Sequence, residues 1–127
     1  MTIRILLVDD LLFDVILTRR ALEGCGVPHE IVVASDGEEA WQLAGERRFD
    51  LLLLDLKMPR VDGFDLLQRL RERAASRLPV IVLSGSSLMA DRARADALGA
   101  IEYVHKALDY EEFQHALRAA LGRHGFC

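Results

Sequence analysis

The run Leu51-Leu52-Leu53-Leu54-Asp55, followed by Leu56-Lys57-Met58-Pro59, decides the fold. Four consecutive leucines are typical of a parallel strand that is buried on both faces. The strand ends on a carboxylate, and ligand sites in open parallel α/β sheets lie outside the carboxyl ends of the strands. A second segment, Ile5-Leu6-Leu7-Val8-Asp9-Asp10, ends in the same way. The two segments together predict three carboxylates at one edge of a parallel sheet.

The composition predicts one folded domain over residues 1–127, because domains most often contain about 100 to 150 residues. Hydrophobic residues make up 51% of the chain and charged residues 28%, which excludes a disordered chain. The formal net charge of −4 predicts no nucleic-acid partner, since such domains usually carry a basic patch. No stretch approaches the roughly 18 apolar residues of a membrane span, so we expect no membrane association.

The two cysteines, Cys25 and Cys127, have neither CxxC spacing nor a neighbouring histidine cluster. This spacing indicates neither a zinc site nor a disulfide framework. The acidic pair by position nine is also unlike the apolar core of a signal peptide. We therefore expect a cytoplasmic protein with reduced cysteines.

Five apolar runs alternate with five segments of helical period, which predicts a parallel sheet with helices on its faces. The second and fifth runs contain polar residues and are expected at the sheet edges. The predicted strands are 3–8, 30–34, 51–55, 80–83 and 101–104, and the predicted helices are 13–24, 38–47, 64–75, 89–98 and 110–121.

Helix ends carry their own signals. Capping-box spacing at Ser35, Asp36 and Asp109 predicts helix starts, and Gly24, Gly99 and Gly122 stand where helices should stop. The last helix shows an apolar stripe, and the charges at 69–77 indicate a solvated helix face. The stripe consists of Phe113, Ala116, Leu117, Ala120 and Leu121.

Polar side chains gather where the strands end. Right-handed crossovers place these ends at one edge of the sheet, which Asp9, Asp10, Asp55 and Ser84 therefore share. Carboxylates about 4 Å apart repel by roughly 4 kcal/mol at an effective dielectric near 20, and a divalent cation removes this conflict. Oxygen ligands favour Mg²⁺, or Mn²⁺ as the alternative, over zinc.

An anion recruited by such a metal needs positive charge and hydrogen-bond donors. Lys106, two residues past the fifth run, supplies a cation of the kind that binds phosphate as a point charge. The Ser84 hydroxyl and the backbone N–H of Gly85 supply donors. The residues by themselves thus indicate a pocket suited to phosphoryl transfer, which relies on positioning and electrostatics.

Together and in this order, these motifs resemble a response-regulator receiver domain of two-component signalling over essentially the whole chain. The resemblance implies a flavodoxin-like α/β fold, with a doubly wound sheet of five parallel strands in the order 2-1-3-4-5 and five flanking helices. It implies a single receiver domain, residues 1–127, without an output domain. The matching motifs are Asp9-Asp10, Leu54-Asp55-Leu56-Lys57-Met58-Pro59 with Asp62-Gly63 after it, Leu83-Ser84-Gly85 and Tyr103-Val104-His105-Lys106.

The resemblance assigns metal binding and phosphoryl acceptance to the acidic residues. Asp55 would be the phosphoacceptor, taking a phosphoryl group from a phosphohistidine of a sensor histidine kinase or a phosphotransfer protein. Mg²⁺ would be held directly by Asp10, Asp55 and the backbone carbonyl of Lys57, and by Asp9 through a water. The chain would then be a phosphoacceptor with autodephosphorylation, not a conventional enzyme.

The resemblance also assigns a switch. Lys106, Ser84 and Gly85 would bind the phosphoryl oxygens. Movement of Ser84 would let Tyr103 swing inward, which would change the face made by the fourth helix, the fifth strand and the fifth helix. The protein would therefore signal by altering a protein-interaction face.

Within the family, the segment Asp14–Leu22 and the following His29-Glu30 resemble stand-alone receivers that serve phytochrome-type histidine kinases. Such receivers often form homodimers, which the apolar Leu11-Leu12-Phe13 would suit. The alternative is that Phe13 and one leucine simply pack under the first helix.

Ala107 departs from the family, which usually has proline at this position, often after a cis peptide. Without proline the trans form is favoured by about 2.5 to 4 kcal/mol, and the sequence does not decide between cis and trans for Lys106–Ala107. The alternative function is therefore a receiver-like interaction module that works without phosphorylation. Two other classes fit less well: a flavodoxin-type cofactor binder needs a phosphate loop where Asp9-Asp10 stands, and an aspartyl phosphatase needs DxD at Asp55.

Overall fold

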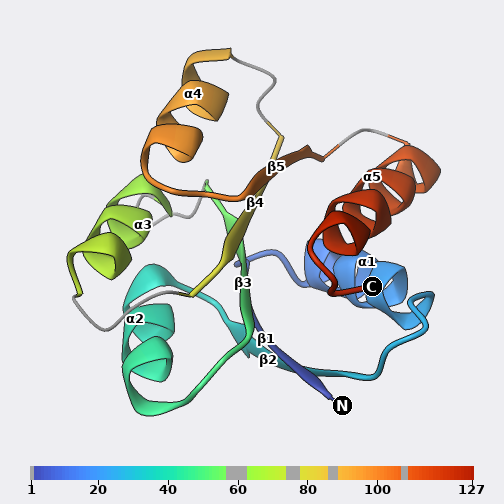
Figure 1. Cartoon of the computed structure of the whole chain (residues 1–127), viewed down its shortest axis with the longest axis horizontal. Helices are drawn as coiled ribbons and strands as arrows, with labels where there is room; N and C mark the ends of the chain where they lie inside the picture. The colour runs from blue at the N-terminus through green and yellow to red at the C-terminus, as the bar shows by residue number, and fades with distance from the viewer. Residues whose placement is uncertain (1, 57–62, 74–77, 86–88, 107–108) are drawn as a thin grey trace.

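The computed structural model describes residues 2–56, 63–73, 78–85, 89–106 and 109–127. Five strands alternate with five helices, as predicted, and most bounds agree within a residue or two (Figure 1). No helix in these ranges is long and apolar enough to span a bilayer. The strands are β1 (Ile3–Val8), β2 (His29–Ala34), β3 (Leu51–Asp55), β4 (Val80–Ser84) and β5 (Glu102–His105), and the helices are α1 (Leu12–Glu23), α2 (Gly37–Glu46), α3 (Gly63–Glu72), α4 (Met89–Ala97) and α5 (Tyr110–Arg123).

The strands form one parallel sheet in the order β2-β1-β3-β4-β5, which confirms the predicted flavodoxin-like topology. β2 and β5 are the edge strands, as their polar residues indicated. Helices α1 and α5 cover one face of the sheet, and α2, α3 and α4 cover the other (Figure 1). The sheet is therefore doubly wound.

The leucine run of β3 explains the two-sided core. Successive side chains of a strand point to opposite faces, so Leu52 and Leu54 belong to the cluster under α2 and α3, whereas Leu51 and Leu53 belong to the cluster under α1 and α5. All four leucines are 0% exposed. A strand that is covered on both faces tolerates a polar side chain only where it leaves the core. Asp55 is the last residue of β3 and occupies such a position.

The helix boundaries predicted from capping residues agree with the structure better than those predicted from glycines. The Asp36 side chain accepts a hydrogen bond from the Glu39 backbone N–H at 2.8 Å and starts α2. Gly99 follows α4 with a φ of +88°, a conformation that favours glycine. The prediction for Gly122 is wrong, because α5 continues through it and the left-handed residue is Gly125.

Two predictions about helix faces are also wrong. Ala116 is exposed, although the apolar stripe of α5 included it. Arg71 is not part of a solvated face: its guanidinium donates hydrogen bonds to the backbone carbonyls of Leu98, Leu78 and Gly99 at 3.0 to 3.2 Å. Partial burial lowers the pKa of Arg71 below its ordinary value. Arg71 therefore connects α3 to the chain segments on either side of β4.

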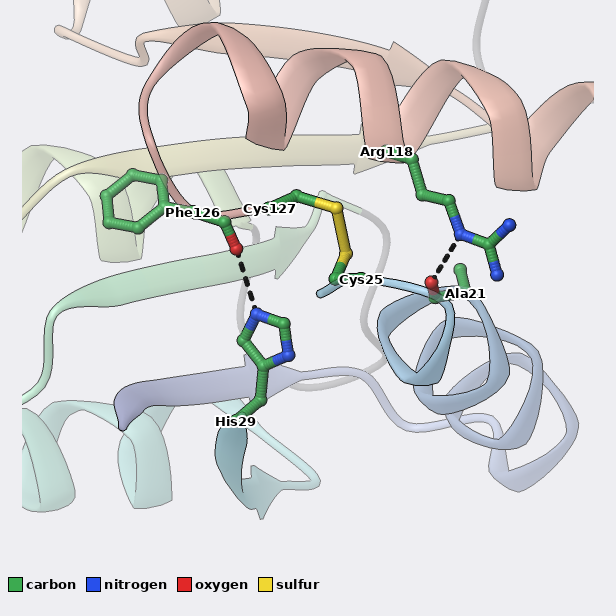
Figure 2. The surroundings of a disulfide bond; sticks show 6 residues. All are labelled: Ala21, Cys25, His29, Arg118, Phe126 and Cys127. Atoms are coloured by element: carbon green, nitrogen blue, oxygen red, sulfur yellow. Dashed lines mark hydrogen bonds between the residues drawn. A yellow bond between two sulfur atoms is a disulfide. The ribbon is translucent and has the colours of Figure 1, made fainter. Parts of the chain in front are cut away.

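The two cysteines form a disulfide, contrary to the expectation of free thiols. Cys25 follows α1 and Cys127 follows α5, and their Cα atoms lie 5.0 Å apart although 102 positions separate them in the sequence (Figure 2). α1 and α5 pack against each other on one face of the sheet, so their carboxyl-terminal ends bring the cysteines together. Spacing rules test only cysteines that are near in sequence and therefore miss this pair.

Candidate functional site

Three carboxylates converge where β1 and β3 end. Val8 pairs with Leu54 in the parallel register, so the residues that follow each strand come out side by side. One oxygen from each of Asp9, Asp10 and Asp55 lies within 4.8 Å of the other two. Asp9 and Asp55 are only 2% and 5% exposed. The predicted convergence of the three acids is confirmed.

Lys106, just after β5, supplies the counter-charge of this acidic cluster. Its Nζ atom lies 2.9 Å from Asp9 Oδ2, 3.0 Å from Asp14 Oδ2 and 3.5 Å from Asp55 Oδ2. Its backbone N–H donates to the Ser84 carbonyl at 2.7 Å, which fixes its position at the end of β4. Burial lowers the pKa of Lys106, but the hydrogen bond to Asp9 and the charges of Asp55 and Asp9 outweigh it, so the pKa is raised above its ordinary value. The lysine is held as a cation among the acids.

Sequence reasoning missed Asp14 as part of this site. Asp14 is an acidic residue in the first turn of α1, and it is half-buried because it faces Lys106. The signal was present: α1 begins three residues after Asp9, so its first turn must lie above the same edge of the sheet. The contact gives the lysine a third carboxylate partner besides Asp9 and Asp55.

The carboxylates fit a hard divalent cation. Asp10 Oδ1 is buried and has no hydrogen-bond partner among the described residues, and an unpaired buried carboxylate oxygen is costly. Asp9 differs, because its Oδ1 accepts from the Leu11 N–H and its Oδ2 accepts from Lys106. An all-oxygen donor set with one unsatisfied oxygen is what Mg²⁺ or Mn²⁺ requires. Lys57, whose carbonyl was predicted as a further ligand, lies outside the described residues.

The predicted phosphoryl-binding residues lie on the neighbouring strands. Ser84 ends β4 and is fully buried, next to Asp55, which pairs with Leu83. Gly85 is exposed, and its carbonyl lies 3.1 Å from His105 Nε2. Ser84 and Lys106 thus occupy the same edge of the sheet as the acids, whereas the donor role of the Gly85 N–H stays a prediction. Ala107 lies outside the described residues.

Tyr103, the predicted switch residue, lies on β5. It is partly buried and packs at the margin of the core cluster under α2 and α3. The guanidinium of Arg92 on α4 lies 5.6 Å from the centre of its ring, and an Arg92 nitrogen lies 3.4 Å from the Tyr103 carbonyl. The side chain therefore joins β5 to α4.

A group of large apolar side chains is exposed beside the acidic pair. Leu11, Leu12, Phe13 and Ile16 are 54%, 74%, 70% and 40% exposed. The alternative in which Phe13 packs under the first helix is therefore wrong, and Val15 is the residue of this turn that is buried.

Comparisons with known proteins agree with this geometry. Residues 5–118 match the family described as response regulator receiver domain. A probable transcriptional regulator, ycf27, from Guillardia theta is 35% identical over 122 residues, which are 94% of this chain and 46% of that protein. The ycf27 protein of Cyanophora paradoxa is 37% identical with similar coverage, 94% and 48%. The chain thus spans about half the length of these relatives.

Solved structures resemble the chain over almost all of its length. The phosphorylated cyanobacterial phytochrome response regulator RcpA superposes with a TM-score of 0.84 at 31% identity, covering 99% of this chain and 94% of that one. The Mn²⁺-bound form of response regulator Rcp1 gives a TM-score of 0.82 at 27% identity, with 97% and 92% covered. Sequence motifs, fold and acidic pocket therefore agree, and the chain belongs to the response regulator receiver domain family.

Proposed function

We propose that this chain is a stand-alone response regulator of two-component signalling, which accepts a phosphoryl group on Asp55 in a Mg²⁺-dependent reaction. The observation that carries the proposal is the convergence of carboxylate oxygens from Asp9, Asp10 and Asp55 around one lysine cation. This arrangement combines a nucleophile, a metal-binding oxygen set and a positive charge at one edge of the sheet. As a receiver, the chain is a phosphoacceptor and not a conventional enzyme.

The transfer requires little covalent chemistry from the protein. An Asp55 carboxylate oxygen attacks phosphorus, the bond between phosphorus and the donor histidine nitrogen breaks, and the acyl phosphate remains on Asp55. Lys106 would form an ion pair with a phosphoryl oxygen on Asp55. Its Nζ atom lies 3.5 Å from Asp55 Oδ2, which is the longest of its three carboxylate contacts. The Ser84 hydroxyl and the Gly85 N–H would donate to the other phosphoryl oxygens. Positioning and charge stabilisation are the main requirements of such a reaction.

Asp10, Asp55 and the Lys57 carbonyl would hold the metal directly, and Asp9 would hold it through a water. When bound, Mg²⁺ neutralises the carboxylates and the incoming phosphoryl oxygens. The Mn²⁺-bound structure of Rcp1 supports the choice of a hard divalent ion. The unpaired Asp10 Oδ1 is the independent support from this chain.

The signal would pass through Ser84 and Tyr103. Movement of Ser84 towards the phosphoryl group would draw Tyr103 inward, away from Arg92 on α4. The face that would change is made by α4, β5 and α5, and it includes a groove of about 410 Å³ that Arg92 and Tyr103 help to line. A change at this groove would alter which proteins bind there.

The proposed phosphodonor is a sensor histidine kinase, of the phytochrome type, or a phosphotransfer protein. The similarity to RcpA and to the bacteriophytochrome response regulator RtBRR supports this choice; RtBRR gives 34% identity and a TM-score of 0.79, with 96% of this chain and 79% of that chain covered. A cytoplasmic location follows from the proposed partner, because such kinases use ATP. Homodimerisation through Leu11, Leu12 and Phe13 is part of the proposal, and sedimentation of Phe13→Ser against wild type tests it.

The direct test is chemical phosphorylation. The protein is incubated with Mg²⁺ and a small phosphodonor, and intact mass is measured before and after hydroxylamine treatment. We expect a mass increase of one phosphoryl group that hydroxylamine removes, because acyl phosphates are cleaved by it. Asp55→Asn should form no adduct, whereas Asp50→Asn, at the other end of β3, should behave like wild type.

The same assay separates the proposal from its alternative. A receiver-like module that works without phosphorylation would form no adduct and would gain no thermal stability from Mg²⁺. An adduct that persists in Asp55→Asn would place the phosphoryl group elsewhere and refute the assignment.

A further inference from the structure

We propose that Cys25 and Cys127 form a reversible thiol–disulfide exchange site, which a dithiol opens and a low-molecular-weight disulfide closes while the protein stays folded. Opening releases the segment 124–127 from the loop between α1 and β2. The inference does not depend on phosphorylation of Asp55, because its chemistry lies at the opposite ends of α1 and α5 from the acidic pocket.

The disulfide lies at the surface. Cys25 and Cys127 are both only partly buried, at the margin of the core cluster under α1 and α5. Each cysteine lies outside regular structure, one just after the end of α1 and the other at the end of the segment that follows α5 (Figure 2). Breaking the bond therefore removes no strand or helix from the fold.

A solvent-open cavity gives access to Cys25. The cavity has a volume of about 400 Å³ and is lined by Cys25 together with Arg19, Glu23 and His29, among others. The next residue, Gly26, has no side chain, and a Cβ there would meet no atom within 4 Å. Cys127 does not line the cavity. A small attacking thiolate therefore reaches Cys25 more easily than Cys127.

One cation, Arg118, lies beside the residue that precedes Cys25. The Arg118 guanidinium lies against Gly24, so closely that a Cβ on that glycine would overlap it. Its Nε donates to the Ala21 carbonyl at 2.8 Å, which holds it there (Figure 2). Arg19 and Glu23, which carry opposite charges, both line the cavity. A nearby cation favours the thiolate of Cys25, which is the group released from the mixed disulfide in the second displacement.

The exchange balances as two displacements. A reductant thiolate attacks Cys25 Sγ, the disulfide breaks, and Cys127 leaves as a thiolate that takes up a proton. The second thiolate of the reductant attacks the mixed disulfide and releases Cys25 as the second thiol, so that two electrons pass from the dithiol to the pair. A small disulfide oxidant reverses both steps.

Few contacts hold the segment 124–127 once the bond is open. The Phe126 carbonyl lies 2.9 Å from His29 Nε2 (Figure 2). The backbone N–H of Phe126 donates to the Leu121 carbonyl at 2.9 Å. His124 Nε2 lies 3.0 Å from Glu102 Oε2. Phe126 also packs at the margin of the core cluster under α1 and α5. A few contacts at the end of a chain can open locally without global unfolding. The disulfide adds a covalent link to these contacts.

A redox titration of the native full-length chain tests the proposal. The protein is equilibrated in buffers with graded ratios of reduced to oxidised dithiothreitol and alkylated with iodoacetamide, and the labels are counted by intact mass. We expect two labels in reducing buffers and none in oxidising buffers, with the same curve from both directions and an unchanged circular dichroism spectrum. The opening rate should rise in proportion to the dithiol concentration.

Three results would overturn the proposal. One is an opening rate that does not depend on dithiol concentration or that needs denaturant, because the pair would then be a permanent structural bond. Another is labelling of both thiols in oxidising buffer. The third is amide exchange at Phe126 that is equally slow in the oxidised and reduced protein, since the segment would then not be released.

Single-cysteine variants compare how readily the sulfur atoms of Cys25 and Cys127 take part in exchange. Cys127→Ser should form a mixed disulfide with oxidised glutathione faster than Cys25→Ser, because the cavity opens at Cys25. The reverse order would contradict this assignment. Asp55→Asn should titrate like wild type in the thiol assay, so that failure of phosphorylation and failure of the redox pair are separate results.

Discussion

Replacement of Asp10 by asparagine is expected to raise the free energy of unfolding of the metal-free protein. One oxygen of Asp10 lies within 4.8 Å of oxygens of Asp9 and Asp55. Two unit charges at that separation repel by about 3.5 kcal/mol at an effective dielectric of 20. Lys106 offsets roughly one of the two repulsions, and partial exposure of Asp10 screens part of the other, so that about 1–2 kcal/mol remains.

Urea denaturation in the presence of a chelator measures this gain. The same titration with added Mg²⁺ should stabilise wild type, because a ligand that binds only the native state adds to the free energy of unfolding. Asp10→Asn should respond much less, since it lacks one ligand charge. Asp96→Asn removes an exposed carboxylate from α4 and is the control for net charge; its effect should stay within about 0.5 kcal/mol of wild type.

The outcome that refutes this reasoning is a metal-free Asp10→Asn protein that is less stable than wild type. The Asp10 carboxylate would then stabilise the fold by accepting a hydrogen bond, and its repulsion with Asp9 and Asp55 would not dominate. An unchanged response to Mg²⁺ in the variant would equally remove Asp10 from the metal site.

Three further predictions follow from single contacts. Gly63→Ala should destabilise the protein by about 1–3 kcal/mol and impair Mg²⁺ binding, because the new Cβ would lie 2.6 Å from Leu56 Cα, next to the strand end that carries Asp55. Denaturation measures the first effect and metal titration the second. The hydrogen bond from Arg123 lowers the pKa of Glu102. The stability that this carboxyl contributes is therefore present above its ordinary pKa and is lost as the pH falls through the lowered value. Thermal melts of Glu102→Gln at decreasing pH should lack this loss. Cys127→Ser should lower the free energy of unfolding by about 2–4 kcal/mol relative to the oxidised protein, and an equal stability of the two in urea would contradict a formed disulfide.

Much of this fold follows from local patterns. Four leucines in succession indicate a strand that is covered on both faces. Such runs alternate with helical segments, and a parallel sheet with helices on both faces is the arrangement that buries them. Parallel strands then carry their terminal residues to one edge. For this reason Asp9, Asp10 and Asp55 could be placed together before any coordinates were known.

Other features depended on which helices lie side by side. Asp14 meets Lys106 because the first turn of α1 lies over the edge where β5 ends, and the two residues are 92 positions apart. Arg71 binds carbonyls that come from two other segments, although its charge indicated a solvated helix face. The Arg71 contacts have no sequence signal, and the signal for Asp14 was only that α1 begins three residues after Asp9.

The sequence by itself determined the parallel sheet, its edge strands and the acidic edge, because these depend on hydrophobic period and on the fixed direction of parallel strands; the strand order came from the resemblance to receiver domains. The tertiary structure alone decided the partners of Lys106 and the pairing of Cys25 with Cys127. The Lys106–Asp9 contact and the disulfide join residues about a hundred positions apart. The first depends on where β5 ends beside the other strands, and the second on the packing of α1 against α5; no local pattern encodes either.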